Sequence, residues 1–363
     1  MLKLNLSKYL FQKWLILPFL AVITFLLTEL LAAKPEITEK IYGQAVYPFI
    51  AGIFSRISVL LPFSLDDIFY VLLILTAVVL MTLLIIRRIR FKSTGKFVLN
   101  ALAVIYILFY FLWGFNYYRP GLNQRLSIES KKPDTEEFMI VFEELIDQTN
   151  NSYTSFDNFD KREIDSLVEE SYKALAPALG LQYPSGIRNV KNITFSRFFA
   201  QAGISGYYGP FFSEVHVNTF NLPVEFPFVL AHEKAHQFGI TGEADANFYA
   251  WLVCSRSGSS KLRYSANMIV LRYFIYQGYQ LEGFKELAAK IDDPVKNDLQ
   301  RIREHWLQLR NEKIDRVAAQ VNDAYLKTNK VEKGIEDYHG VVKFVMDFKL
   351  DSAFQKKWNL TSE

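Results

Sequence analysis

The chain has 363 residues, of which 50% are hydrophobic and 22% are charged. This composition excludes a disordered chain, and the length accommodates a membrane region together with one globular domain. The 41 basic residues are nearly balanced by 38 acidic ones, and no basic run is interleaved with aromatic residues, so we expect no nucleic-acid partner. The single cysteine, Cys254, excludes an internal disulfide and a multi-cysteine metal site, and its apolar surroundings predict a core position.

Three apolar stretches in the first third of the chain are long enough to cross a bilayer core, which takes about 20 helical residues. They cover residues 14–33, 68–86 and 97–115. The second and third contain no charged residue, and the first contains only Glu29. Helices of a soluble core seldom run so far without a charge. The sequence therefore predicts three transmembrane helices.

Basic residues predict the orientation of these spans. The short loop after the second stretch holds five of them, Arg87, Arg88, Arg90, Lys92 and Lys96, and three lysines precede the first stretch, Lys3, Lys8 and Lys13. By the positive-inside rule both regions are cytoplasmic, so the chain after about Tyr117 lies on the outer side. A cleaved signal peptide is the competing interpretation of residues 14–33, but residues 31–33 form a poor cleavage site. Cleavage would leave the later spans in the same orientation.

The segment 47–63 is apolar but contains two prolines, a glycine and an arginine. Because these residues interrupt the apolar run, we expect the segment to lie at the membrane surface rather than to cross. If it did cross, the topology would be inverted. Ser64, followed by Asp66 and Asp67, has the pattern of an N-cap and acidic first turn for the second span.

Beyond Pro120 the composition is that of a soluble domain. Asp134 and Glu137 form a capping pair for an amphipathic helix, and a second helix is expected over residues 159–179, ending at Gly180. Short strands are expected at 192–199 and 215–218, separated by the glycine-rich segment 203–210, and the periodicity is helical from Leu222 onward. We therefore expect a mainly α chain, with a membrane domain (1–119) and a mostly helical α+β domain (120–363) whose small sheet precedes the helix described next.

Residues 232–236 read His-Glu-Lys-Ala-His, the pattern of zinc metalloproteases. Positions four apart lie on one face of a helix, so His232 and His236 can bind one zinc ion while Glu233 reaches the water on that metal as the general base. The competing interpretation is a pair of solvated histidines on an ordinary helix.

The residues that follow strengthen the metal interpretation. Gly239 can end the helix with a left-handed turn, and Thr241 can cap a second helix that returns toward the metal. Catalytic zinc needs a third protein ligand, for which Glu243 is the nearest carboxylate, with Asp245 as the alternative. Asn247, one turn further on, could hydrogen-bond a ligand histidine. We expect about one zinc ion per chain.

These residues carry two resemblances. The His-Glu-x-x-His helix followed by Glu-x-x-x-Asn is similar to the zincins of the glutamate-liganded class. Over nearly the whole chain, the three spans, the segment WGFNYYRP at 113–120, the segment GYYGPF at 206–211 and AHEKAHQFGI at 231–240 resemble the bacterial membrane proteins grouped as domain of unknown function 3810. That resemblance implies a bacterial cytoplasmic membrane and a zinc-protease-like site in a zincin-like domain, but no substrate. It also leads us to expect a second acidic residue directly after Glu243, where this chain has Ala244.

Further candidates lie outside the motif. The period-two segment ending at Asn218 predicts an edge strand, so residues 208–218 could dock an extended peptide by strand addition. His216 on that strand could contact the metal or the transition state, or it could simply be solvated. Tyr338 and His339, in a glycine-flanked loop, could supply a donor to a developing oxyanion. His305 is expected to have no role in the site.

These residues suggest three candidate functions. The first is a membrane-anchored zinc metallopeptidase that acts on a peptide or protein on the extracytoplasmic side. The second is a catalytically silent zincin-like module that binds a peptide or envelope component as a scaffold or sensor. An intramembrane protease is disfavoured because charged residues surround the motif too densely.

Overall fold

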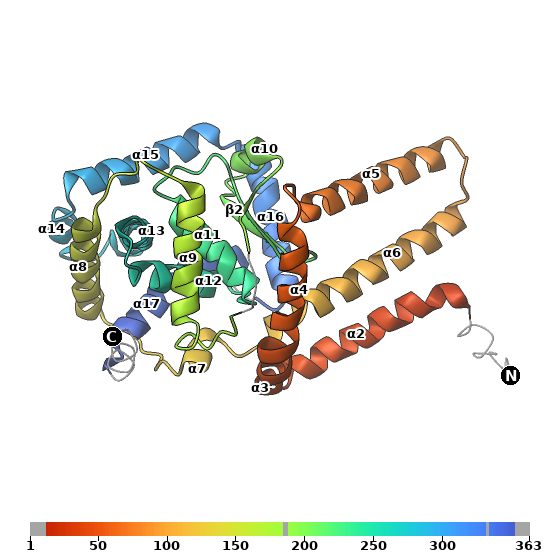
Figure 1. Cartoon of the computed structure of the whole chain (residues 1–363), viewed down its shortest axis with the longest axis horizontal. Helices are drawn as coiled ribbons and strands as arrows, with labels where there is room; N and C mark the ends of the chain where they lie inside the picture. Colours follow the sequence, from red (N-terminus) through yellow and green to blue (C-terminus); the bar gives the residue numbers. More distant parts are fainter. Residues whose placement is uncertain (1–11, 184–187, 332–333, 353–363) are drawn as a thin grey trace.

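The computed structural model describes residues 12–183, 188–331 and 334–352. The chain is mostly helical, as predicted, and three long helices project from one side of a larger globular part (Figure 1).

The three projecting helices correspond to the predicted spans. They are α2 (Ile16–Ala32, preceded by the short turn η1, Lys13–Leu15), α5 (Leu65–Ile85) and α6 (Phe91–Leu112). Among the helices of the described residues, these are the ones long and apolar enough to cross a membrane. The third begins and ends earlier than predicted. It ends earlier because the backbone leaves the α-helix at Trp113 and continues as the 3-10 turn η3 (Gly114–Tyr118). α2 packs along α6, whereas the apolar stretch of α5 has no buried residue.

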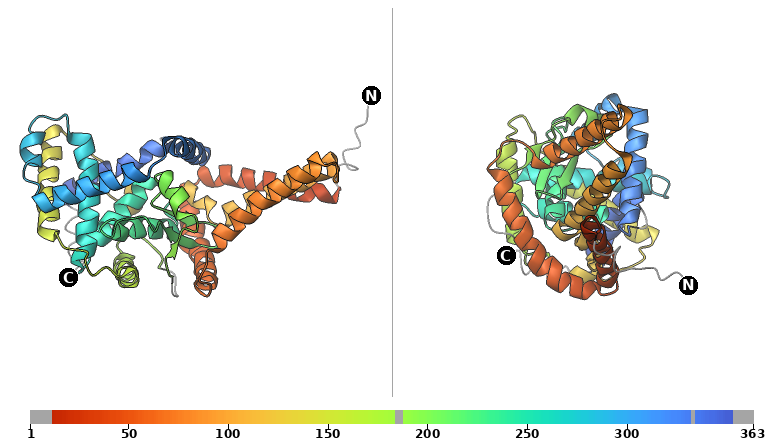
Figure 2. Two further views of the ribbon diagram at one scale, coloured as in Figure 1. Left: turned by 90° about the horizontal axis from the view of Figure 1, so that it is seen from above. Right: turned by 90° about the vertical axis from the view of Figure 1, so that its right-hand side faces the viewer.

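The segment between the first two spans is helical but does not run beside them. It consists of α3 (Pro35–Thr38), the π-helical stretch η2 (Glu39–Val46) and α4 (Tyr47–Val59). In both Figure 1 and Figure 2, α4 lies across the base of the projecting helices, next to the globular part. This run is not among the helices of the described residues that are long and apolar enough to cross a membrane, which agrees with the prediction that 47–63 does not cross.

The globular part is built from twelve helical segments of the described residues. They are α7 (Leu122–Leu126), α8 (Thr135–Ser152), α9 (Lys161–Leu175), α10 (Ser196–Gln201), α11 (Phe226–Gln237), α12 (Glu243–Ser255), α13 (Ser260–Gly278), α14 (Phe284–Ala288), α15 (Asp293–Leu309), α16 (Glu312–Thr328), η4 (Gly334–Gly340) and α17 (Val341–Leu350). The capping box at Asp134 and Glu137 is present, and Gly180 adopts a left-handed conformation after α9, as expected. α9 itself ends four residues before the predicted boundary at residue 179.

A small sheet packs against α11. Its strands are β1 (Lys191–Asn192), β2 (Gly206–Gly209) and β3 (Glu214–Val217), in the order β1-β3-β2, with β3 parallel to β1 and antiparallel to β2. Val215 and Val217 belong to the same buried cluster as the apolar residues of α11. The sheet therefore forms one wall beside the helix that carries the His-Glu-x-x-His motif.

The sheet corrects three predictions. The expected strand at 192–199 reaches only Asn192, and the chain turns into α10 at Ser196. The glycine-rich segment expected to separate two strands contains β2 itself, because Gly206 and Gly209 allow close approach of neighbouring side chains. β3 is the central strand and is fully buried, so it has no free edge for a docking peptide.

α11 lies at the centre of the globular part. All of its twelve residues are buried, and it packs against α9, α12, α13 and the sheet. Burial on every side means that each polar group on α11 needs a partner. These partners differ between the two faces of the helix, and one face carries the candidate site.

Candidate metal centre

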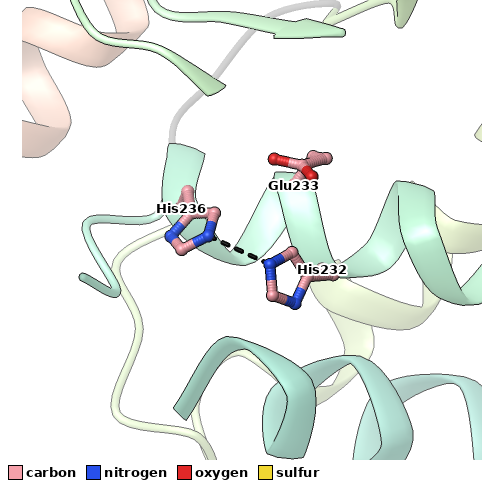
Figure 3. Close-up of side chains that lie close together, drawn as sticks. All are labelled: His232, Glu233 and His236. Atoms are coloured by element: carbon pink, nitrogen blue, oxygen red, sulfur yellow. Dashed lines mark hydrogen bonds between the residues drawn. The ribbon is translucent and has the colours of Figure 1, made fainter. Parts of the chain in front are cut away.

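The two histidines of the motif lie on one face of α11, with their rings close together (Figure 3). The Nε2 atoms of His232 and His236 are 3.1 Å apart, and the rings meet edge to face. Glu233 projects from the same turn of the helix, and its carboxylate lies within 4.8 Å of the histidine nitrogens. The spacing of four residues has therefore brought three candidate groups together, as the motif predicts.

The chain returns to this face through a tight turn. Gly239 has φ +80°, a left-handed conformation that other residues seldom adopt. A Cβ at this position would also lie within 3 Å of side-chain atoms of Asn116, Arg119 and Tyr47. The turn leads into α12, which begins at Glu243 with Gly242 as its N-cap, so the expected cap at Thr241 is wrong.

Glu243 completes a triangle of ligand atoms. Its Oε2 lies 3.2 Å from Nε2 of His232 and 3.4 Å from Nε2 of His236. Ligand atoms around a tetrahedral zinc ion with bonds of 2.0–2.1 Å are roughly 3.3–3.4 Å apart, so the three atoms fit one face of such a site. Asp245 instead forms an ion pair with Arg125, at 3.0 Å. Of the two candidate carboxylates, Glu243 is therefore the one placed to hold a metal.

The hydrogen bonds to the other ring nitrogens fix how the histidines present their lone pairs. Nδ1 of His232 lies 2.8 Å from Oδ1 of Asn247, and Nδ1 of His236 lies 2.7 Å from the carbonyl oxygen of Ile240. Because both partners are acceptors, each Nδ1 carries the proton and each Nε2 presents a lone pair toward Glu243. The hydrogen bond predicted between Asn247 and a histidine is present.

The result is a buried cluster of acceptors that lacks a donor. Oε2 of Glu243 has no hydrogen-bond partner among the described residues, although it is buried. Three lone-pair-bearing atoms facing one another repel unless a proton or a metal ion lies between them. The donor set of two imidazoles and one carboxylate is the set that zinc uses in catalytic sites.

The pKa values of Glu243 and His236 are shifted by burial and by each other's charge. Burial opposes the charge on Glu243, but the neighbouring His236 and His232 outweigh burial and hold the pKa of Glu243 well below the usual range. Burial alone would lower the pKa of His236, but the charge of Glu243 raises it to about 9. Both shifts favour positive charge beside the carboxylate of Glu243.

Glu233 occupies a space that one glycine provides. A Cβ on Gly206 of β2 would lie 2.6 Å from Oε1 of Glu233, so a larger residue there would displace the carboxylate. Burial raises the pKa of Glu233 to about 7, against the opposing charges of His232 and His236. A carboxylate with a pKa in this range can accept and return a proton at neutral pH. The glycine-rich segment contains this residue, but the sequence did not indicate its contact with Glu233.

Tyr338 lies beside the centre, whereas His339 does not contact it. The Tyr338 ring stacks parallel to that of His232 with centroids 6.4 Å apart, and the negative charges of Glu243 and Glu233 add to burial in raising the pKa of its hydroxyl. Its backbone carbonyl accepts from the side-chain amide of Asn247, at 3.3 Å. The neighbouring His339 is exposed and stacks on Tyr276 instead. One residue of the predicted pair therefore lies beside the centre.

His216 points away from the centre. Its Nε2 lies 2.7 Å from Oγ of Ser64 and 3.5 Å from Glu214, and the ring is fully buried. Glu214 also accepts from the backbone N–H of Asp66, at 2.9 Å. This network joins the sheet to the first turn of α5, where Ser64 caps the helix as predicted. His216 is therefore neither solvated nor a metal contact, and it connects the sheet to the second span.

Residues that follow the third span form another wall of the centre, which the sequence analysis did not identify. The indole N–H of Trp113 donates to the carbonyl of His236, at 3.1 Å, and the two rings are 6.4 Å apart. The hydroxyl of Tyr117 donates to that of Tyr325, at 3.1 Å. Burial and the neighbouring Tyr325 raise the pKa of Tyr117, and the negative charge of Glu243 adds to this shift. Only the concentration of aromatic residues at 113–118 could have signalled this contact.

The remaining positions considered in the sequence contribute no group to the centre. His305 donates from Nε2 to the carbonyl of Phe220, at 2.6 Å, and Cys254 is fully buried in the core. Ala244, where an acidic residue was expected, is buried with its Cβ 2.9 Å from the position of a Cβ on Gly340. An acidic side chain would not fit at that position.

The chain is therefore mostly helical, with three candidate membrane spans and a buried His-Glu-His group near the end of the third span. Comparison with known proteins adds the family. Residues 42–346 match the family described as protein of unknown function (DUF3810), and the chain belongs to that family. A search of curated proteins and a search of solved structures each found no match.

Proposed function

We propose that this chain is a membrane-anchored zinc metallopeptidase. The observation that carries the proposal is the triangle formed by the two Nε2 atoms and Oε2 of Glu243, with edges of 3.1, 3.2 and 3.4 Å and no donor to the carboxylate oxygen. His232, His236 and Glu243 would hold one zinc ion. When bound, zinc would polarise a peptide carbonyl and lower the pKa of a water molecule toward about 7.

The residues around the triangle have the groups that peptide hydrolysis needs. Glu233 would accept a proton from the attacking water and return it to the leaving amine, which suits its raised pKa of about 7. The hydroxyl of Tyr338 would donate to the oxygen on which negative charge develops. Asn247 and the carbonyl of Ile240 would keep the two histidine rings oriented toward the metal.

Metal removal tests this proposal. The purified full chain in detergent should bind about one zinc ion and hydrolyse members of a mixed peptide library, lose hydrolysis on treatment with a chelator, and regain it when zinc is added back. Zinc binding without hydrolysis of any member would favour the catalytically silent scaffold or sensor. Absence of zinc binding would contradict both interpretations.

We further propose that the globular part lies outside the cytoplasm of a bacterial cell, with the N-terminus inside. The basic residues Arg87, Arg88 and Arg90 in the loop between α5 and α6, with Lys92 and Lys96 in the first two turns of α6, support this orientation. A reporter fused after Glu363 should be active only outside the cytoplasm, and one inserted between Arg87 and Lys96 only inside. Activity of the first fusion in the cytoplasm would contradict the orientation.

A further inference from the structure

All three projecting helices end against elements that build the candidate metal centre. α5 begins with Asp66 and Asp67, which accept hydrogen bonds from the backbone of Phe212, next to β2 and β3, and from Thr194. The end of α2 contacts the segment after α16 through an ion pair of Glu29 with Lys330, at 3.0 Å. α6 ends at Leu112, one residue before the tryptophan that contacts α11. No linker separates the centre from the bases of the spans (Figure 2).

The depth of the centre relative to the bilayer follows from α6. Lys92 and Lys96 lie in its first two turns, so its apolar part is residues 97–112, which extends about 24 Å. Because a hydrocarbon core is about 30 Å thick, Leu112 lies no farther out than the outer hydrocarbon boundary. The headgroup layer adds roughly 5–8 Å on each side. The ring of Trp113 is 6.4 Å from the ring of His236. The metal-binding histidines therefore lie within about one headgroup layer of the hydrocarbon boundary.

Exposed apolar residues surround the bases of the spans. Phe49 and Leu60 at the ends of α4 are 70% and 79% exposed, and Phe198 of α10 is 55% exposed. On α16, Val317 and Val321 are 59% and 65% exposed, and they share a stripe with Tyr325, which contacts Phe109 of α6. In both views α16 and α4 lie on the side of the globular part from which the spans project (Figures 1 and 2). A lipid surface that is continuous with the spans covers such a ring.

We infer that the substrates are polypeptides anchored in the same bilayer, cleaved within a few residues of their membrane anchor. This inference rests on the proposed peptidase function and specifies its substrate class. An extended chain advances 3.3–3.6 Å per residue, so a centre within about one headgroup layer of the hydrocarbon meets a chain roughly two to three residues after it leaves the bilayer core. A soluble peptide gains none of this positioning, because no anchor holds it near the bilayer surface.

The test uses substrates in which sequence preference is held constant. The zinc-loaded full chain is reconstituted in vesicles of phosphatidylethanolamine and phosphatidylglycerol. The substrates are a library of polypeptides, each made of identical repeats of one short sequence, either carried by a transmembrane anchor or free in solution. Mass spectrometry locates the cut bonds. We expect cuts to concentrate in the repeat nearest the anchor, within about five residues of the bilayer.

The outcomes separate this inference from the proposed function. Cuts distributed evenly over the repeats, or equal rates for anchored and free polypeptides, would overturn the inference and leave the metallopeptidase proposal standing. No cleavage of any polypeptide by the zinc-loaded chain would contradict the metallopeptidase proposal and the inference together.

A pair of variants tests the contact with lipid. Val317→Glu combined with Val321→Glu places two charges against the anionic surface, and we expect it to reduce cleavage of the anchored polypeptides at least about threefold while leaving hydrolysis of a free peptide unchanged. Ile140→Glu is the matched control, because Ile140 is 59% exposed on α8, on the side of the globular part away from the spans. Equal effects of the double variant and the control on anchored substrates would contradict contact of α16 with the bilayer.

Discussion

The two faces of α11 both carry buried charged or polar side chains, but they satisfy them in opposite ways. On the face toward α9, Lys234 is 1% exposed and forms ion pairs with Asp165, at 2.7 Å, and with Glu169, which is also paired with Arg188. Each acidic group on that face meets a cation that the protein supplies. On the other face, Glu243 meets two histidines whose Nε2 atoms are acceptors.

This difference indicates what each face is for. A buried network whose charges balance within the protein connects helices and needs no ligand. A buried group of acceptors with no donor is costly unless a cation binds it. Lys234 lies between Glu233 and His236 in the motif, yet its side chain belongs to the balanced network. Consequently, substitutions on the two faces should separate metal affinity from stability.

The largest effect is expected from removing a metal ligand. His232→Ala or His236→Ala should lower zinc affinity more than about 100-fold, beyond the 10- to 100-fold typical of residues that only orient a ligand. Competition with a chelator of known affinity measures it. His305→Ala is the control, because its contacts, to the carbonyl of Phe220 and the ring of Trp306, lie outside the centre. Equal zinc affinity in all three variants would contradict a metal site formed by His232 and His236.

On the opposite face, Lys234→Met should reduce stability and leave zinc binding intact. Removing the cation leaves Asp165 and Glu169 partly uncompensated in a buried setting, which typically costs about 3–5 kcal/mol of unfolding free energy. Unfolding of the full chain in detergent, followed by circular dichroism, gives the change. Loss of zinc stoichiometry in the folded variant would show that the two faces are not independent.

The balanced face also predicts a dependence of stability on pH. Burial opposes ionisation of Glu169, but Lys234 and Arg188 lower its pKa to about 2. A lowered pKa stabilises the folded chain above the ordinary value of about 4.5, and the contribution is lost as the pH falls from there to about 2. The shift corresponds to at most about 3 kcal/mol. Glu169→Gln should therefore flatten the dependence of unfolding free energy on pH across this range, and an unchanged slope would contradict the contribution.

A smaller effect is expected from the residue that orients His232. Asn247→Leu removes the acceptor at 2.8 Å from Nδ1 and should lower zinc affinity about 10- to 100-fold. Asn247→Asp is the matched variant, because it keeps an acceptor at the same position and should retain most of the affinity. Equal zinc affinities of Asn247→Leu and the wild type would contradict the orienting role.

Local patterns in the sequence predicted much of this architecture. The apolar lengths predicted the three projecting helices, and the caps at Ser64 and Asp134 are present. The spacing of the motif, Gly239 and Glu243 predicted the two helices that meet at the centre, because each signal acts within a few residues of the chain.

Contacts between distant segments were not predictable in this way. The sequence contains no local signal that Gly206 adjoins Glu233, that Trp113 contacts α11, or that Tyr338 stacks on His232. His216 shows the same limit, since its alternation predicted an exposed edge strand while pairing on both sides buried it. These contacts depend on how the spans, the sheet and the C-terminal segment assemble around α11.

The most direct measurement compares peptide turnover by two variants, one within α11 and one at the residue that precedes it. Glu233→Gln keeps the shape of the side chain but cannot accept a proton, so turnover should fall at least about 100-fold while zinc content stays at the wild-type level. Glu225→Gln is the control, because Glu225 precedes α11 and accepts from the indole of Trp306 away from the centre, at 2.9 Å. Loss of turnover in the Glu233 variant alone is the predicted result. Equal turnover by the zinc-loaded wild type and Glu233→Gln would contradict the role of Glu233 as general base and the peptidase mechanism built on it.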